Sequence, residues 1–82
     1  MAALSPRHHA LGAAVRALRV ERGLTQDQLA ERAKMSENYV GDTERGERNI
    51  SVRVLWQFAD GLGVQVSTLM REAERQLATA DK

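Results

Sequence analysis

Two short segments of helical pattern, joined by a tight turn, constrain this chain more than any other feature of its sequence. Thr25 is followed three residues later by Gln28, a capping box that predicts the start of a short helix. Residues 34–35 interrupt that helix, and Ser36 is a favourable N-cap for another helix that runs to about Arg45. The fold therefore has to contain two packed helices of about eight residues that are joined by a three-residue turn.

Three further helices are predicted around this pair. Ser5 caps a helix that ends near Gly23, Ser51 caps one that ends at Gly63, and Ser67 caps the last. Their apolar residues recur at helical spacing, which predicts one buried face on each helix. The residues expected to form the core are Leu18, Leu29, Val40, Leu55, Phe58, Leu62 and Leu69.

The composition agrees with an all-α fold of five helices. The chain has 82 residues, of which 43% are hydrophobic, and a single proline. Alanine and leucine dominate the hydrophobic residues, and both favour helix. A chain of this length forms one domain, because it cannot enclose a second core.

The sequence lacks the residue combinations typical of an enzyme, a cofactor site or a metal site. Cysteine is absent, which excludes thiolate zinc sites and thiol chemistry. His8 and His9 are adjacent, so on a helix they point about 100° apart and make a poor metal pair. We therefore expect no enzyme activity, no cofactor, no metal and no small-molecule ligand. No apolar run reaches the ~20 residues of a membrane span, so we expect a cytoplasmic protein that contacts no membrane.

The spacing of the two central helices is that of a helix-turn-helix motif. The residues around it resemble the phage-repressor and Cro type of helix-turn-helix family, also called XRE-like. The resemblance covers residues 11–70, and residues 39–49 are especially similar to the controller proteins of restriction–modification systems. The stretches that carry it are Leu18-Arg19, Arg22 to Gln26, Leu29-Ala30, Ser36 to Val40, Glu44 to Gly46, Arg48 to Ser51, Phe58-Ala59 and Leu62 to Val64.

This resemblance implies that the partner is double-stranded DNA and that the third helix lies in the major groove. The residues implied to face base edges are Ser36, Glu37, Asn38 and Asp42. Those implied to contact the DNA backbone are Gln26, Tyr39, Arg45, Arg48 and Asn49. Arg19 and Glu44 resemble a family ion pair that ties the first helix to the end of the third. The net charge is only +1, so the positive charge of such an interface has to be local.

Five positions depart from the family pattern. Lys34 stands where many members have glycine in a left-handed turn, which costs about 1–2 kcal/mol. Gly41 lies inside the third helix, where it costs about 1 kcal/mol relative to alanine. Thr43 replaces a usual aliphatic residue. Glu37 and Asp42 are acidic, so they repel phosphate but can accept a hydrogen bond from N4 of cytosine.

The last helix and its neighbour are predicted to form a homodimer interface. Beyond Leu69, apolar residues continue along the last helix, and no later segment is available to cover them. Trp56 either covers the last helix, which would leave a monomer, or meets a partner chain. The residues assigned to the interface are Val52, Trp56, Val66, Met70, Ala73 and Leu77.

The expected division of the chain follows from these elements. Residues 1–10 form an N-terminal segment that can extend the first helix. Residues 11–78 form the helix-turn-helix domain with its C-terminal dimerisation helix, and residues 79–82 form a frayed tail.

The expected function is that of a sequence-specific DNA-binding transcriptional regulator. A dimer would bind a two-fold operator whose half-sites lie about 34 Å apart, one turn of the double helix. One alternative stays open: the motif serves as a protein-interaction module, such as an antitoxin or an anti-repressor partner. DNA binding through arginines would depend steeply on salt, whereas a protein adaptor would bind duplex DNA only weakly.

Overall fold

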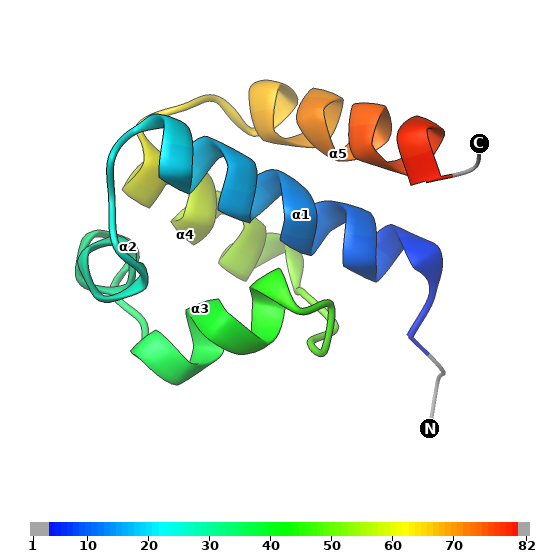
Figure 1. The fold of residues 1–82 in the computed structure, drawn as a ribbon. Helices are drawn as coiled ribbons and strands as arrows, with labels where there is room; N and C mark the ends of the chain where they lie inside the picture. Colours follow the sequence, from blue (N-terminus) through cyan, green and yellow to red (C-terminus); the bar gives the residue numbers. More distant parts are fainter. Residues whose placement is uncertain (1–3, 81–82) are drawn as a thin grey trace.

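Five helices make up the computed structural model, which describes residues 4–80 and contains no strand in that range (Figure 1). The all-α fold predicted from the sequence is thereby confirmed. Within these residues no helix is both long enough and apolar enough to cross a membrane. The helices are α1 (Pro6–Glu21), α2 (Gln26–Ala33), α3 (Glu37–Glu44), α4 (Val52–Leu62) and α5 (Val66–Ala80).

The first four helices begin at the polar residues predicted to cap them. At each start a side-chain oxygen accepts a hydrogen bond from a backbone N–H of the first turn, which satisfies a donor that the helix itself leaves unpaired. These caps are Ser5, Thr25, Ser36 and Ser51.

The start of α5 differs from the prediction. The helix begins at Val66, so Ser67 lies in its first turn and does not cap it. The carbonyl oxygen of Gln65 accepts the N–H of Leu69 at 3.2 Å, which closes the first turn. Val66 packs against the core, and burying its side chain favours the earlier start.

The predicted terminal segments are partly helical. α1 already begins at Pro6, so the last five residues of the predicted segment 1–10 belong to it. α5 continues to Ala80 and includes residues 79–80 of the predicted tail. Residues 1–3 and 81–82, to which these two predictions also apply, lie outside the described residues.

The core lies where the apolar faces of the helices converge. Six of the seven predicted core residues are buried, whereas Leu55 is half-buried at the edge of the cluster. Thr43 is also buried, and its hydroxyl donates a hydrogen bond to the carbonyl oxygen of Tyr39 at 2.8 Å. The threonine therefore fills an aliphatic position without leaving its hydroxyl unpaired. The six buried residues are Leu18, Leu29, Val40, Phe58, Leu62 and Leu69.

Two helix crossings depend on glycine. A Cβ atom on Gly12 of α1 would lie 2.1 Å from the carbonyl oxygen of Thr43 in α3. A Cβ atom on Gly61 of α4 would lie 2.9 Å from the Cβ of Ala33 in α2. At both places a side chain would push two helices apart, so these glycines set the distance between them.

α5 lies antiparallel to α1 along most of its length (Figure 1). Ala73 is consequently buried in the core, and Leu77 is half-buried. The prediction that nothing covers the apolar stripe of α5 is therefore wrong for Ala73, which is not available to a partner chain, whereas Met70 is 39% exposed. The physical reason is that α5 packs back along α1, so that α1 covers part of this stripe.

The turn between α2 and α3 requires a left-handed backbone conformation at Lys34. Its φ and ψ angles are 61° and 50°, and no other non-glycine residue among those described has a positive φ. Gln57 of α4 donates its side-chain N–H to the carbonyl oxygen of Ala33, at 3.0 Å, and so caps the end of α2. The hydrogen bond from α4 therefore stabilises the turn, whereas the Cβ atom of Lys34 makes its left-handed conformation strained.

Replacing Lys34 by glycine is expected to raise the free energy of unfolding by about 1 kcal/mol, because glycine adopts this conformation without strain. Urea denaturation followed by circular dichroism measures the change. Lys34→Ala is the control, since alanine keeps the Cβ and should give no comparable gain. An equal gain from both variants would assign the effect to the lysine side chain and contradict the prediction.

Candidate nucleic-acid interface

The first turn of α3 faces solvent at the edge of the molecule. α3 packs on α1 and α2 through its buried residues Val40, Gly41 and Thr43. Packing of that face leaves Glu37 and Asn38 exposed on the opposite side. Ser36 is exposed as well, although its hydroxyl oxygen already accepts the N–H of Tyr39 at 3.1 Å. A short helix held by one face therefore presents its N-terminal side chains outward.

An ion pair of low solvent exposure ties α3 to α1. The Glu44 carboxylate accepts Arg19 Nε at 2.6 Å and Arg19 Nη2 at 3.1 Å, which is a bidentate pair. The two side chains are 4% and 12% exposed, respectively. Arg19 Nη1 also donates to the carbonyl oxygen of Leu24 at 2.8 Å. The guanidinium group thus holds the end of α1, the start of α2 and the end of α3 together.

Gln26, predicted to contact a DNA phosphate, belongs to the same network. Its side-chain nitrogen donates to Glu44 Oε1 at 3.0 Å. An amide nitrogen carries two hydrogens, so one donor remains for an external acceptor. The bond to Glu44 fixes this side chain at the N-terminus of α2.

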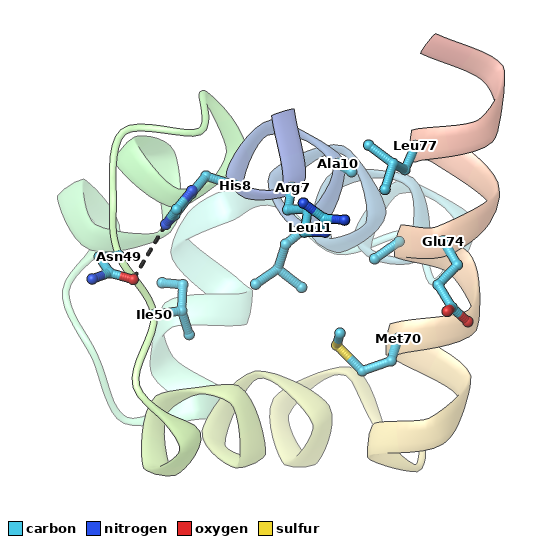
Figure 2. Close-up of a pocket in the computed structure, with 10 residues that line it drawn as sticks. Arg7, His8, Ala10, Leu11, Asn49, Ile50, Met70, Glu74 and Leu77 are labelled. Carbon is cyan, nitrogen blue, oxygen red and sulfur yellow. Dashed lines mark hydrogen bonds between the residues drawn. The ribbon is translucent and has the colours of Figure 1, made fainter. Parts of the chain in front are cut away.

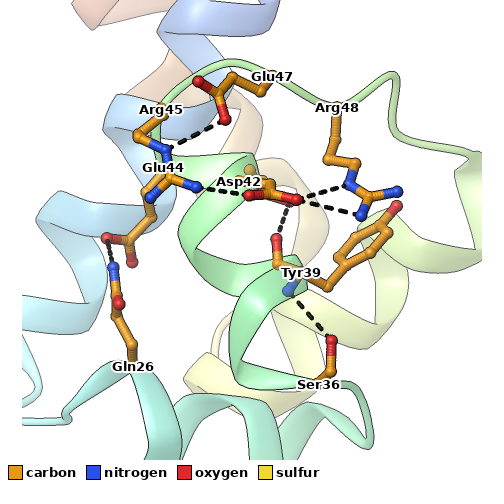
Figure 3. A network of polar contacts seen from close by, with 9 residues as sticks. Gln26, Ser36, Tyr39, Asp42, Glu44, Arg45, Glu47 and Arg48 are labelled. Carbon is orange, nitrogen blue, oxygen red and sulfur yellow. Dashed lines mark hydrogen bonds and ion pairs between the residues drawn. The ribbon is translucent and has the colours of Figure 1, made fainter.

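Asp42, predicted to read a base, is occupied by two arginines (Figure 3). Its Oδ1 accepts Arg45 Nη2 at 2.5 Å. Its Oδ2 accepts Arg48 Nη2 at 3.1 Å and Arg48 Nε at 3.2 Å. The Arg48 guanidinium also lies over the ring of Tyr39, 4.7 Å from its centre, and that ring stacks on Phe58. The carboxylate of Asp42 therefore faces the chain's own arginines.

Arg45 has a second acidic neighbour in the loop that follows α3. Its Nε donates to Glu47 Oε1 at 3.1 Å. This hydrogen bond, with the charges of Glu47 and Asp42 and the hydrogen bond to Asp42, raises the pKa of the Arg45 guanidinium above its ordinary value, although desolvation acts in the opposite direction. The group is a permanent cation at any pH of interest.

Asn49 is held from α1 by a residue that the sequence pattern did not identify. His8 Nε2 lies 3.2 Å from Asn49 Oδ1, and His8 Nδ1 accepts the N–H of Ser5 at 2.9 Å. Both contacts are satisfied by the neutral ring protonated on Nε2. The signal in the sequence was a histidine three residues after the cap, where glutamate or glutamine is usual.

A groove of about 380 Å³ separates the start of α1 from α5 (Figure 2). Its floor is apolar, with Leu11, Ile50, Met70 and Leu77 among its lining residues. Met70 is 39% exposed there. On α4 the predicted interface residues Val52 and Trp56 are 68% and 55% exposed, while Val66 is half-buried. Trp56 therefore does not fold fully onto the last helix.

Residues 10–73 match the protein family described as "Helix-turn-helix domain". The immunity repressor protein of Bacillus phage phi105 is 45% identical over 62 residues, which cover 76% of this chain. That stretch is 43% of the phage repressor, so the chain spans less than half of the length of this relative.

Two solved structures are similar over most of the chain. The clp gene regulator ClgR from Corynebacterium glutamicum is 32% identical, with a TM-score of 0.88 over 96% of this chain and 84% of that one. The restriction–modification controller protein C.Esp1396I, solved as a tetramer on its natural 35-base-pair operator, has a TM-score of 0.85 over 90% of this chain and 97% of that one. At 23% identity the second likeness is one of fold alone.

Proposed function

The chain belongs to the helix-turn-helix domain family, and from this premise we propose that it is a sequence-specific DNA-binding transcriptional regulator that acts as a homodimer on a two-fold operator. The observation that carries the proposal is the exposed first turn of α3, presented by a helix whose opposite face is buried against α1 and α2. An α-helix presented in this way fits the major groove.

The proposed contacts follow from the placement of the side chains. Glu37 and Asn38 face base edges, and Ser36 can still donate its hydroxyl hydrogen there. Around them, Gln26, Tyr39, Arg45, Arg48 and Asn49 approach the DNA backbone. Asp42 is not among the proposed base contacts, because its carboxylate is hydrogen-bonded to Arg45 and Arg48.

The relatives support this assignment by what their names state. One is an immunity repressor, another regulates clp genes, and a protein of the same fold was solved on its operator. Because the chain spans less than half of the phage repressor, regulation by this chain remains our proposal.

Selection of bound duplexes from a random pool, followed by footprinting, tests the proposal directly. We expect one preferred sequence with two-fold symmetry and half-sites about 34 Å apart. The logarithm of the binding constant should fall steeply with the logarithm of the salt concentration, since several counterions are released. A flat salt dependence with weak duplex binding would instead favour the protein-interaction alternative.

Replacing Asn38 by alanine is expected to weaken binding to the selected duplex by about 1–3 kcal/mol, because an asparagine can bond N6 and N7 of one adenine. Binding to a random duplex should change little. Competition assays with both duplexes measure the difference.

Arg45→Ala is the matched contrast, since it removes a proposed phosphate contact next to the same helix. It should weaken both duplexes alike and lower the salt slope by about one unit. If Asn38→Ala gave this uniform pattern, Asn38 would contact the DNA backbone and not a base.

The proposed dimer uses the exposed part of the predicted interface. Val52 and Trp56 on α4 and Met70 on α5 expose apolar surface, whereas Ala73 is buried by α1. A two-fold contact would cover each patch with its equivalent and place two α3 helices on one side of the DNA. The patch is small, so the dimer should dissociate in the micromolar range.

Replacing Met70 by aspartate is expected to shift the protein from dimer to monomer at concentrations of tens of micromolar, because the new charge would be buried without a partner. Sedimentation equilibrium measures this shift. Val20→Asp is the control, since Val20 of α1 is 58% exposed but lies outside the proposed interface. A Met70→Asp variant that dimerises like the wild type would exclude this interface.

A further inference from the structure

The segment that would meet DNA carries more negative than positive charge. Residues 37–49 contain four carboxylates and two guanidinium groups, those of Arg45 and Arg48. Glu44 is the partner of Arg19, whereas Asp42 and Glu47 are bonded to the two arginines of the segment. Any DNA phosphate that approaches Arg45 or Arg48 therefore meets a cation whose Nε and Nη2 donors already bond a carboxylate.

Asp42 differs from Glu47 in the number of arginines it holds. Its two oxygens bond different guanidinium groups, Arg45 through one N–H and Arg48 through two. Asp42 is also the more enclosed of the two acids, with 27% of its side chain exposed against 56% for Glu47. Asp42 is therefore the residue of α3 whose hydrogen bonds orient both arginine side chains.

The contacts that Asp42 accepts are those that a phosphate would accept. Arginine binds carboxylates and phosphates through the same N–H groups, often two at a time, as Arg48 does here. A carboxylate in this position has two effects. It holds both guanidinium groups in one arrangement, and it competes with DNA phosphates for them.

We propose that Asp42 is a specificity-determining positioning residue, an internal phosphate mimic that restrains Arg45 and Arg48 from binding DNA of arbitrary sequence. This inference rests on the proposed function. On a random duplex, attraction to phosphate supplies nearly all of the binding, so competition by Asp42 weakens it directly. On the operator, base contacts fix the protein in register, and arginines already held in place lose less conformational freedom on binding.

The test is Asp42→Asn, which keeps the shape of the side chain and removes its charge. Binding to the selected operator and to a random duplex of equal length is measured over a range of salt concentrations. We expect about three- to tenfold tighter binding to the random duplex and a salt slope steeper by about one unit. Operator affinity should stay within about twofold, so that the ratio of the two affinities falls.

Two further variants separate this role from a general effect of charge. Glu47→Gln removes the same charge from the loop but releases Arg45 alone, so its effect on the random duplex should be clearly smaller. In an Arg45→Ala/Arg48→Ala background, Asp42→Asn should have no effect, because the groups that Asp42 restrains are gone.

Four outcomes would overturn the inference while leaving the proposed function intact. A loss of operator affinity with unchanged random binding would make Asp42 a base contact, as first expected from the sequence. Equal gains in affinity for both duplexes would mean that Asp42 acts only through its negative charge. Equal effects of Asp42→Asn and Glu47→Gln would mean the same. A shift that persists in the double-arginine background would show that Asp42 acts without them. Failure of the proposed function itself would be seen with the wild-type protein, before any variant is tested, because the wild type would bind neither duplex.

Discussion

Replacing Gly12 by alanine is expected to lower the free energy of unfolding by about 3 kcal/mol, although alanine is the better helix former. The added Cβ would lie 2.1 Å from the carbonyl oxygen of Thr43 and 2.9 Å from that of Glu44. Both atoms belong to the backbone of α3, so neither can rotate away. α1 and α3 would have to separate, and the packing between them would be lost. Urea denaturation of the wild type and the variant measures the difference.

Gly41→Ala is the matched control for this prediction. Gly41 also lies inside a helix, but its nearest neighbours would be Arg45 Nη1 at 3.3 Å and Gln26 Oε1 at 3.7 Å. These are the far ends of flexible side chains, which can move by the few tenths of an ångström required. Alanine should therefore keep or raise the stability here, by up to about 1 kcal/mol. Equal stabilities of the Gly12 variant and the wild type would mean that α1 and α3 do not approach so closely.

The elements of the fold could be predicted because their signals are local. The caps Ser5, Thr25, Ser36 and Ser51 act on N–H groups within three residues, so the sequence alone places the first four helix starts. The start of α5 was misplaced because burial of Val66, a tertiary effect, decides it. Local sequence rules fail where packing against a distant element is stronger than a cap.

The parts that could not be predicted depend on residues far apart in the sequence. The need for glycine at position 12 arises from a carbonyl of residue 43, and the burial of Ala73 arises from the packing of α5 along α1. Asp42 could be predicted to lie on the outer face of α3. Its hydrogen bond to Arg48 could not be predicted, because Arg48 lies six residues later in a loop without regular structure. Spacing along a helix therefore indicated which residues share a surface, and not which of them bond each other.

Replacing Glu44 by glutamine is expected to lower the free energy of unfolding by about 3 kcal/mol, because it leaves the Arg19 guanidinium buried without a counter-charge. The same change weakens the acceptor of Gln26, so the N-terminus of α2 and the C-terminus of α3 lose a common partner. Glu72→Gln is the control. It removes a carboxylate that is bonded to Arg75 on the surface of α5, where the guanidinium remains hydrated, and its effect should be much smaller.

A double variant, Arg19→Met with Glu44→Leu, tests whether the loss comes from the unpaired charge or from the missing connection. Two apolar side chains in place of the pair need no counter-charge, so most of the lost stability should return. Binding to DNA should nevertheless be weaker than that of the wild type, because Gln26 no longer has the Glu44 oxygen that holds it against α3. If stability did not return, the pair would be needed for its geometry and not for the balance of its charges. If the double variant bound DNA as tightly as the wild type, the orientation of Gln26 by Glu44 would not contribute to the interface.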